Sequence, residues 1–428
     1  MAIELLGKSK DQLSALCVEL GEPAYRGAQL YHALYVERIF DLARMSTLPA
    51  ALRERLANQA QITMPIVRQR YVSQDGSVRY LFALPGSESP KTTESTTESA
   101  ESAEKSRPVR PASVEAVFMP SEGRQTICIS TQAGCAVDCQ FCLTAQLGLI
   151  RNLTPGEIVA QVLLPLEDHK AALTANTNIV LMGQGEPLLN FDSVTAALRI
   201  LLDPKGVAIS PKHATLSTSG IVPGIERLGK EEVRPHLAIS LNASNDEQRN
   251  ALMPINRKYP LATLMTACQE YPLRSWEYLM FEYVMLGGVN DSLADARRVV
   301  KLLAPLKAAK VNLIPWNPGQ LPYHESSVED IDLFQKLLIE RGIPTFVRHS
   351  RGRDVMAACG QLALNELAGS PLAILSTNRQ RRHPARSSLL LPGVSIRAPN
   401  VKLQASATYN RSIVAGSTLP PKYFCSAR

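Results

Sequence analysis

Aromatic residues and long apolar stretches are scarce in this chain of 428 residues, in which Phe, Trp and Tyr together make up 5%. No apolar stretch approaches the roughly 20 residues that a helix needs to cross a bilayer. Residues 1–6 also lack the basic and then apolar order of a secretory signal. We therefore expect a cytoplasmic protein with no membrane partner.

Acidic residues are absent from the last part of the chain. Residues 370–428 contain nine Lys and Arg residues and no Asp or Glu, whereas the whole chain has a net charge of +7. The rest of the chain is therefore slightly acidic, and the overall charge does not by itself indicate a nucleic-acid partner. We interpret residues 369–428 as a basic, flexible C-terminal extension.

Large apolar side chains are also missing from residues 88–107, which are rich in Ser, Thr and Glu. Such a segment cannot offset the entropy lost on ordering by burying apolar surface. We predict a disordered Ser/Glu-rich insertion over residues 87–112 and assign it no chemistry.

Before this insertion, the apolar pattern changes from helical to extended. Spacings near 3.6 residues predict a small helical accessory domain over residues 1–62. Alternation around Asp75 and Gly76 predicts a hairpin within residues 63–86, which would join this domain to the rest of the chain.

Residues 113–368 alternate short apolar runs with helical stretches. The runs begin at Thr126, Asn178, Ala214, Leu237, Phe281, Val311 and Thr345. This repetition predicts an α/β fold of parallel strands with helical crossovers, either a barrel or an open sheet, with the chemistry at the carboxyl ends of the strands. One helix start is well marked, because Thr154, Pro155 and Glu157 suit an N-cap, a first-turn proline and a capping box.

Four of the eight cysteines fall within fifteen residues. Cys135, Cys139 and Cys142 have the spacing C-x3-C-x2-C, and three such thiolates can ligate three irons of a [4Fe-4S] cluster, leaving the fourth iron open to a small molecule. The alternative is a zinc site, which would need a fourth ligand such as Cys128, although structural zinc more often uses paired C-x2-C motifs. The spacing favours the iron-sulfur interpretation.

The cysteine motif resembles that of radical S-adenosylmethionine enzymes, because Phe141 precedes the last cysteine and the motif follows the first expected barrel strand. In that superfamily the open iron binds S-adenosylmethionine, and one-electron reduction cleaves it to a 5′-deoxyadenosyl radical. Residues 182–187 resemble the glycine-rich stretch that contacts the methionine end of this cofactor. The resemblance implies a partial (β/α) barrel of the TIM type over residues 113–368, with a [4Fe-4S] cluster and S-adenosylmethionine as cofactors.

Further stretches resemble one family, the bacterial dual-specificity enzymes that methylate C2 of adenine in 23S rRNA and in tRNA. They are residues 151–154, 182–187, 216–220, 237–241, 315–318 and 357–361. Adenine C2 is an electron-poor carbon without a nucleophilic lone pair, so a radical route is required. The family methylates one of its own cysteines with a first S-adenosylmethionine. The radical from a second removes a hydrogen from that methyl group, and a covalent RNA adduct follows.

The resemblance also implies roles for single residues. Cys359 matches the cysteine that carries the methyl group, Cys128 the cysteine that resolves the adduct by forming a disulfide, and Glu115 the proton acceptor. Cys135, Cys139 and Cys142 match the iron ligands, and the cofactor-binding positions are Gly185, Glu186, Ser217, Ser240, Leu241, Asn242 and Asn317. Without the resemblance, Cys359 and Cys128 would be interpreted as buried structural residues.

Two positions depart from the family pattern. Gln184 stands where family members usually have Met, and Asn242 stands where they usually have His. Asn can form hydrogen bonds but cannot carry a proton, which leaves the cofactor contacts of Asn242 open. Cys17, Cys268 and Cys425 match nothing functional.

The resemblance implies RNA and an electron donor, such as flavodoxin or ferredoxin, as partners of a monomeric enzyme. We expect RNA contacts from the N-terminal helices and from Arg348, Arg351 and Arg353, with the target adenine extruded from its stack. One alternative is the related resistance methyltransferase that modifies C8 of adenine and shares several motifs. A second is a non-catalytic RNA-binding protein with a zinc or iron-sulfur centre, although the matches of Cys128 and Cys359 argue against it.

Overall fold

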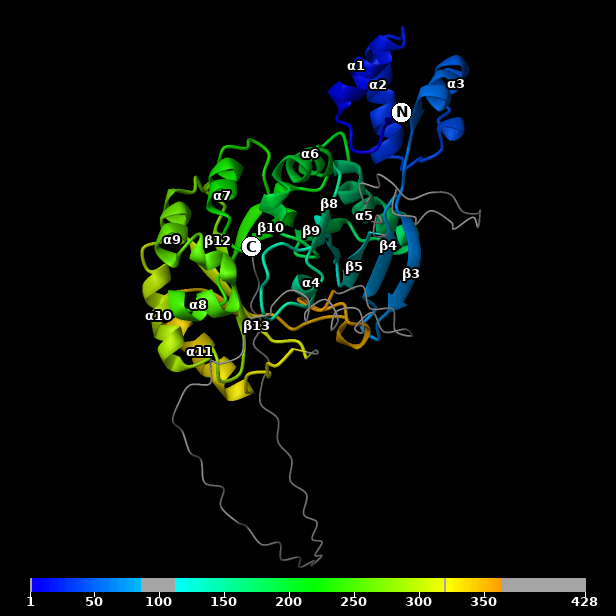
Figure 1. The fold of residues 1–428 in the computed structure, drawn as a ribbon. Coiled ribbons are helices and arrows are strands. Elements are labelled where there is room, and N and C mark those ends of the chain that lie inside the picture. The colour runs from blue at the N-terminus through cyan, green and yellow to red at the C-terminus, as the bar shows by residue number, and fades with distance from the viewer. Residues whose placement is uncertain (1, 86–111, 319–320, 363–428) are drawn as a thin grey trace, which may run out of the picture. The chain divides into compact units, whose positions relative to one another are not determined.

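A ten-stranded sheet organises the chain (Figure 1). The computed structural model describes residues 2–85, 112–318 and 321–362. The expected insertion up to residue 111, the expected basic extension and Cys425 lie outside these described residues. Among the described helices, none is long and apolar enough to span a bilayer.

The strands of this sheet run in the order β14-β13-β12-β11-β10-β9-β6-β5-β4-β3. Their bounds are Ile66–Val72 (β3), Val78–Ala83 (β4), Ser113–Ser121 (β5), Arg124–Cys128 (β6), Asn176–Leu181 (β9), Ala214–Thr218 (β10), His236–Ser240 (β11), Leu279–Met285 (β12), Ala309–Pro315 (β13) and Thr345–Val347 (β14). β6 and the six strands from β9 to β14 pair in parallel, and each overlaps one of the predicted apolar runs.

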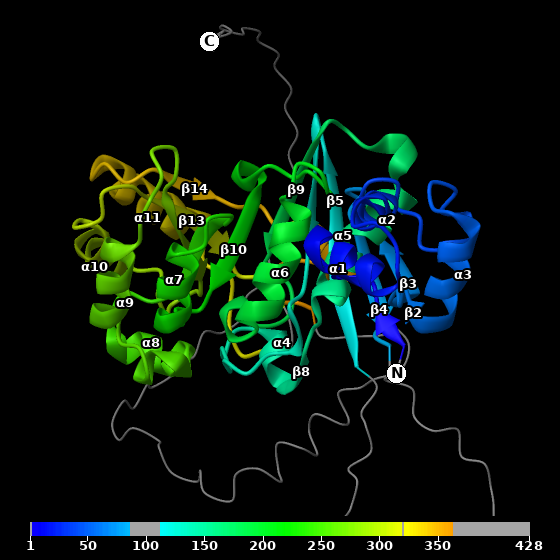
Figure 2. The ribbon, with the colours of Figure 1, turned by 90° about the horizontal axis from the view of Figure 1, so that it is seen from above.

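The helices between the parallel strands cover the outer side of the sheet (Figures 1 and 2). They are α5 (Pro155–Asp168), α6 (Phe191–Leu201), α7 (Val222–Gly229), α8 (Asp246–Leu252), α9 (Leu261–Glu270), α10 (Leu293–Leu303) and α11 (Val328–Glu340). Strand residues such as Leu216 and Phe281 join helix residues such as Leu198 in one continuous buried core. β3 and β14 are the two ends of the strand order, so the sheet is open, and the predicted α/β fold with a partial barrel is confirmed.

An antiparallel hairpin joins the N-terminal part of the chain to the parallel strands. β3 and β4 pair antiparallel, and Asp75 and Gly76 lie in the turn between them, as predicted. Asp75 Oδ1 accepts a hydrogen bond from the Ser77 amide at 2.8 Å. Gly76 has a φ of +79°, which glycine adopts without strain.

The first sixty residues form a helical unit with a short two-stranded sheet. It consists of β1 (Ile3–Glu4), α1 (Lys10–Glu19), α2 (Tyr25–Tyr35), α3 (Ala50–Gln59) and β2 (Ala60–Gln61). A Cβ on Gly7 would lie 2.4 Å from the Gly156 nitrogen, so this unit packs directly on the start of α5. The Tyr31 hydroxyl donates a further hydrogen bond to Asp203 Oδ2 at 2.9 Å.

α5 begins where the sequence predicts. The Thr154 hydroxyl accepts a hydrogen bond from the Glu157 amide at 3.2 Å, and the Glu157 carboxylate accepts one from the Thr154 amide at 2.9 Å. The cysteine loop does not run straight into this helix. The short helix α4 (Leu143–Gln146) and the strand β8 (Leu149–Asn152) intervene, and β8 pairs with β7 (Gln132–Gly134) across the loop.

Candidate active site

A cavity opens at the carboxyl ends of the parallel strands, with a volume of about 1020 Å³ including its open mouth. Ten predicted site residues line it: Cys135, Cys139, Cys142, Gly185, Glu186, Ser217, Ser240, Asn242, Asn317 and Cys359. The fold thus brings together side chains from segments that are far apart in the sequence. The other three, Glu115, Cys128 and Leu241, are buried beside it and are not part of its wall.

The three clustered cysteines lie in the loop between β7 and α4. Burial raises the pKa of Cys135 to about 12, and burial together with the neighbouring thiols raises the pKa of Cys139 well above its ordinary value. Three thiolates here therefore need compensating positive charge. Three sulfur donors around a cavity fit a cluster of irons with one site open to that cavity. The three side chains do not converge on one point as ligands of a single metal ion would, and no other three His, Cys, Asp or Glu side chains in the described ranges do so.

The segment that carries Cys359 is hydrogen-bonded to the cysteine loop. The Leu143 amide donates to the Gly360 carbonyl at 2.8 Å, directly after the last cysteine of the cluster. The Thr144 hydroxyl donates to the carbonyl of Leu362 at 2.6 Å. These two bonds hold Cys359 beside the three clustered cysteines.

The Cys359 thiol faces the cavity. The residue as a whole is exposed. The protein atoms packed around its sulfur remove it from water, which raises the pKa of the thiol to about 11. The Glu282 carboxylate raises this pKa further, whereas the Arg348 guanidinium lowers it. At neutral pH the thiol is therefore protonated.

Cys128, at the end of β6, lies close to Cys359. It is buried among Val117, Val355 and Leu362. Burial and the negative charge of a Cys359 thiolate both raise the pKa of Cys128. All seven cysteines in the described ranges are free thiols, so the two are not joined in this structure.

Glu115 is fully buried on β5 and forms an ion pair with Arg79 of β4. The Arg79 guanidinium lies 4.1 Å from the centre of the Tyr71 ring. Gln184 donates from Nε2 to Glu115 Oε2 at 3.4 Å. Glu115 is therefore not the solvated strand residue that its position alone suggests, and Gln184, a departure from the family pattern, contacts it directly.

Gly185 and Glu186 follow β9. Gly185 has a φ of +97°, and a Cβ there would lie 2.5 Å from Gln132 Cβ, so a side chain at this position would collide with β7. The buried Glu186 carboxylate accepts hydrogen bonds from the Ser219 amide and hydroxyl at 2.7 and 2.8 Å. The Glu186 amide donates to Gln132 Oε1 at 2.9 Å. These contacts hold the glycine-rich loop between β7 and the end of β10.

Ser217 and Ser240 share one wall of the cavity, with their hydroxyl oxygens 3.3 Å apart. Leu241, the next residue, is buried in the core instead. Its amide donates to the Glu282 carbonyl at 3.0 Å, and its carbonyl accepts from Arg249 Nε at 3.1 Å. Both backbone groups of Leu241 are thus paired within the protein, and the residue packs behind the cavity wall.

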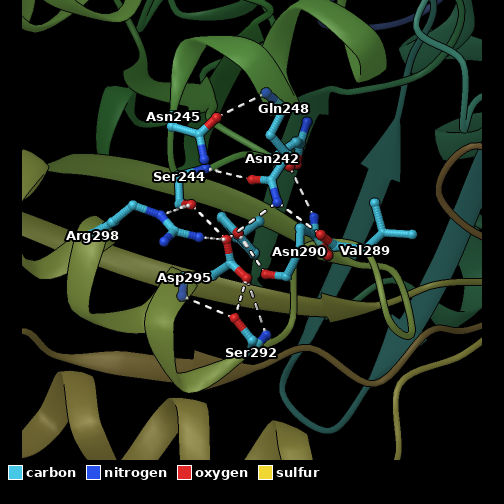
Figure 3. A network of polar contacts seen from close by, with 10 residues as sticks. Asn242, Ser244, Asn245, Gln248, Val289, Asn290, Ser292, Asp295 and Arg298 are labelled. Carbon is cyan, nitrogen blue, oxygen red and sulfur yellow. Dashed lines mark hydrogen bonds and ion pairs between the residues drawn. The ribbon is translucent and has the colours of Figure 1, made fainter. Parts of the chain in front are cut away.

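Asn242 belongs to the polar network of Figure 3. Its φ is +54°, a conformation that Asn adopts more readily than most residues. Its Oδ1 accepts a hydrogen bond from the Val284 amide at 2.8 Å, and its carbonyl accepts one from Asn290 Nδ2 at 2.9 Å. The Asn242 side chain thus connects the ends of β11 and β12, a contact that needs no protonatable group.

Sequence reasoning missed two charged residues beside the cavity. Arg249 of α8 is fully buried and donates hydrogen bonds to the carbonyls of Ser219 and Ser240 at 2.6 and 3.1 Å, which links β10 to β11. Burial lowers the pKa of Arg249 to about 10. Glu282, in the middle of β12, lines the cavity wall. A carboxylate inside an otherwise apolar strand was the signal that could have revealed it.

The arginines that were expected to contact RNA differ in their surroundings. Arg351 forms an ion pair with Asp75 at 3.4 Å, and Arg353 forms one with Glu325 at 3.3 Å. Both therefore connect segments of the protein itself. Arg348 is exposed, and its charge acts on the thiol that faces the cavity.

Two family profiles match this chain. The profile of the radical SAM superfamily matches residues 129–300, which contain the cysteine loop and most of the parallel strands. The profile of the ribosomal RNA large subunit methyltransferase N-terminal domain matches residues 3–62, which form the helical unit.

Several named proteins are similar over most of the chain. The "Probable dual-specificity RNA methyltransferase RlmN" of Koribacter versatilis is 49% identical over 351 residues, covering 81% of this chain and 98% of that protein. The "Dual-specificity RNA methyltransferase RlmN" of Anaeromyxobacter dehalogenans is 42% identical and covers 86% of this chain and 94% of that protein. The crystal structure of a radical SAM methyltransferase from Sphaerobacter thermophilus matches with a TM-score of 0.74 and 38% identity, over 84% of this chain and 99% of that chain.

Proposed function

This chain belongs to the RlmN family of dual-specificity RNA methyltransferases, within the radical S-adenosylmethionine superfamily, and from this premise we propose that it methylates C2 of an adenine in 23S rRNA and in tRNA. The observation that carries the proposal is the position of Cys359, whose thiol faces the same cavity as Cys135, Cys139 and Cys142. A carrier cysteine beside a radical source is what methylation of an electron-poor carbon requires.

The residues around the cavity fit the cofactors of the family, a [4Fe-4S] cluster and S-adenosylmethionine. When bound, these cofactors supply a 5′-deoxyadenosyl radical. Cys135, Cys139 and Cys142 would hold three irons. The cofactor contacts would come from Gly185, Glu186, Ser217, Ser240, Asn242 and Asn317, with Leu241 supporting them. Asn317 Oδ1 is buried without a hydrogen-bond partner among the described residues, and it is an available acceptor in the cavity wall.

The proposal gives three further residues a chemical task. Cys359 carries the methyl group and becomes bonded through it to the RNA. Cys128 then attacks the Cys359 sulfur, so that a disulfide forms as the bond between this sulfur and the carbon on the RNA breaks. The electron pair of the broken bond stays on that carbon, which takes up a proton and becomes the methyl group. Glu115 accepts the proton that leaves adenine C2, and its ion pair with Arg79 holds the carboxylate in place on β5.

The partners complete the proposal. The target adenine would be extruded from its stack to reach the cavity, with RNA contacts from the helical unit and from Arg348. An electron donor such as flavodoxin or ferredoxin would reduce the cluster of a monomeric enzyme. Because its substrates are ribosomal and transfer RNA, we infer a cytoplasmic site of action.

Anaerobic turnover tests the proposed reaction. The chain is incubated with S-adenosylmethionine, a reductant and unmodified rRNA or tRNA, and the digested nucleosides are identified by mass spectrometry. We expect 2-methyladenosine from both RNAs. A product of 8-methyladenosine would favour the C8 alternative, and one zinc per chain in place of about four irons would favour a binding protein.

Two cysteine variants test the separate roles of Cys359 and Cys128. Cys359→Ala should abolish methyl transfer with unchanged iron content, because Cys359 is not an iron ligand in this proposal. Cys128→Ala should still form the covalent RNA adduct but release little product. Loss of iron in Cys359→Ala would contradict the assigned role.

A further inference from the structure

Glu282 is a buried carboxylate in the cavity wall to which the proposed reaction gives no task. It lies in the middle of β12, paired in register with Ser240 of β11 and Asn312 of β13. Its side chain is buried, and Oε1 accepts a hydrogen bond from Asn312 Nδ2 at 2.8 Å. Burial of a carboxylate is costly, so its presence inside an apolar strand calls for an explanation.

Glu282 and Cys359 line the same cavity, and the charge of Glu282 acts on the Cys359 thiol. The carboxylate of Glu282 raises the pKa of the Cys359 thiol, as does Cys142, whereas the guanidinium of Arg348 lowers it. Burial raises the pKa of Glu282 itself, against the opposing effects of Asn312 and Arg348. A protonated thiol therefore lies near a carboxylate whose basicity is increased by its surroundings.

Methylation of Cys359 requires that its sulfur lose a proton. A neutral thiol is a weak nucleophile, and proteins activate such groups with an adjacent base. The efficiency of a general base increases as its pKa approaches the working pH, which is the direction in which burial moves Glu282.

We propose that Glu282 is the base that takes the Sγ proton of Cys359 when this sulfur is methylated, an inference that rests on the proposed function. A bond forms between Cys359 Sγ and the methyl carbon, while the bond between that carbon and the sulfonium sulfur breaks. The electron pair of the broken bond stays on the leaving thioether, S-adenosylhomocysteine. The proton passes to the Glu282 carboxylate and from there to water in the cavity, so the step needs no oxidant or reductant.

The other carboxylate of the cavity is less suited to this task. Glu186 accepts hydrogen bonds from the Ser219 amide, the Ser219 hydroxyl and the Leu188 amide. These donors favour the ionised form of Glu186 and oppose the burial that raises its pKa, and the charge of Glu186 acts on Cys135 and Cys139. Among the residues that the structure describes, Glu282 accepts one such bond, from the Asn312 amide group, and its charge acts on Cys359.

The test measures methylation of the protein itself, without RNA. The reconstituted chain is incubated with S-adenosylmethionine, and the fraction of S-methylated Cys359 is followed by peptide mass spectrometry over a range of pH. Glu282→Gln should slow the methylation about 10²- to 10⁴-fold at neutral pH, the usual contribution of a general base. Glu282→Asp should recover part of the rate, and Glu329→Gln, which alters an exposed carboxylate on α11, should match the unaltered chain.

The pH profile separates a base from a merely structural residue. In Glu282→Gln the deficit in methylation rate should shrink about tenfold per pH unit, because the thiol increasingly ionises without a base as the pH rises toward its pKa. An equal rate in Glu282→Gln, or a deficit that is constant with pH, would overturn the proposal. If the unaltered chain fails to methylate Cys359, the proposed function fails first, and the two failures are thereby distinguished.

A second readout does not depend on the cofactors. The rate at which iodoacetamide alkylates unmethylated Cys359 is measured against pH for the unaltered chain and for Glu282→Gln. Removing the neighbouring negative charge should shift the midpoint to lower pH in the variant. An unchanged midpoint in a variant with normal circular dichroism and iron content would show that Glu282 does not act on Cys359.

Discussion

Asn317 donates a hydrogen bond from Nδ2 to the backbone carbonyl of Cys359 at 3.1 Å. Asn317 follows the end of β13, whereas Cys359 belongs to the last described segment of the chain. The next residue, Gly360, accepts a hydrogen bond from the Leu143 amide of the cysteine loop at 2.8 Å. One strand end and the cysteine loop together therefore fix the position of the Cys359 thiol.

Asn317→Ala should remove the hydrogen bond from the residue after β13 to the Cys359 carbonyl. Loss of this hydrogen bond should lower the free energy of unfolding by about 1 kcal/mol. Methylation of Cys359 should also be slower, because the thiol is less well positioned. Iron content should stay unchanged, since the cysteine loop is intact. Peptide mass spectrometry and iron analysis of the same sample check both points, and loss of iron with normal methylation of the remaining holoenzyme would contradict this account.

The candidate iron ligands and one helix start could be predicted from sequence because a local pattern carries the signal. The spacing of Cys135, Cys139 and Cys142, and the capping box at Thr154, are patterns within a few residues. The parallel strands could be predicted for the same reason. The surroundings of Glu115 could not, because they depend on contacts with residues on other strands.

Gly185 and Leu241 illustrate what sequence reasoning could not resolve. Both stand in motifs that suggest contact with the cofactor, yet Gly185 lines the cavity while it packs on Gln132 of β7, and Leu241 is buried in the core. Adjacent positions in a motif point to opposite sides of the backbone. Which of them reaches the cavity is decided by packing between strands that are distant in sequence.

The buried ion pair between Arg79 and Glu115 should dominate the local stability. Arg79→Met removes a cationic partner of the buried Glu115 carboxylate, which should lower the free energy of unfolding by about 3–5 kcal/mol. The double variant Arg79→Met with Glu115→Leu should recover most of this loss, because no buried charge remains. Urea unfolding of the three chains measures both effects. Equal stability of the single and double variants would refute the explanation.

His236 should make the stability depend on pH. It is buried at the start of β11, and its ring packs edge-on against Trp276 with centroids 5.1 Å apart. Burial lowers its pKa, Lys310 and Arg274 lower it further, and Glu277 opposes them.

The sign follows from proton linkage. Below the pKa of an unfolded His, about 6.5, the unfolded chain binds a proton that the folded chain binds only at lower pH. Acidification through this range therefore lowers the free energy of unfolding, until the lower pKa of the folded state is passed. Urea unfolding at pH 7.5 and pH 5.5 should show a smaller decrease for His236→Gln than for the unaltered chain. An equal decrease in both would assign the pH dependence to other groups.

Gly185→Ala should lower the free energy of unfolding by more than conformational strain alone would, and Gly123→Ala provides the matched control. Gly123 has a φ of +69°, and no atom lies within 4 Å of the position that a Cβ would take. Alanine there should lower the free energy of unfolding only by the strain of the left-handed backbone, about 1–2 kcal/mol.

At Gly185 the added Cβ would lie 2.5 Å from Gln132 Cβ and 2.7 Å from the Gln132 nitrogen. The glycine-rich loop must move away, and Glu186, whose amide bonds to Gln132 Oε1, moves with it. We therefore expect Gly185→Ala to be less stable than Gly123→Ala and to bind S-adenosylmethionine more weakly, whereas Gly123→Ala keeps normal affinity. Urea unfolding and equilibrium binding to the reconstituted chains measure the two quantities. If both variants lose the same stability and neither loses affinity, the contact with β7 does not position the loop.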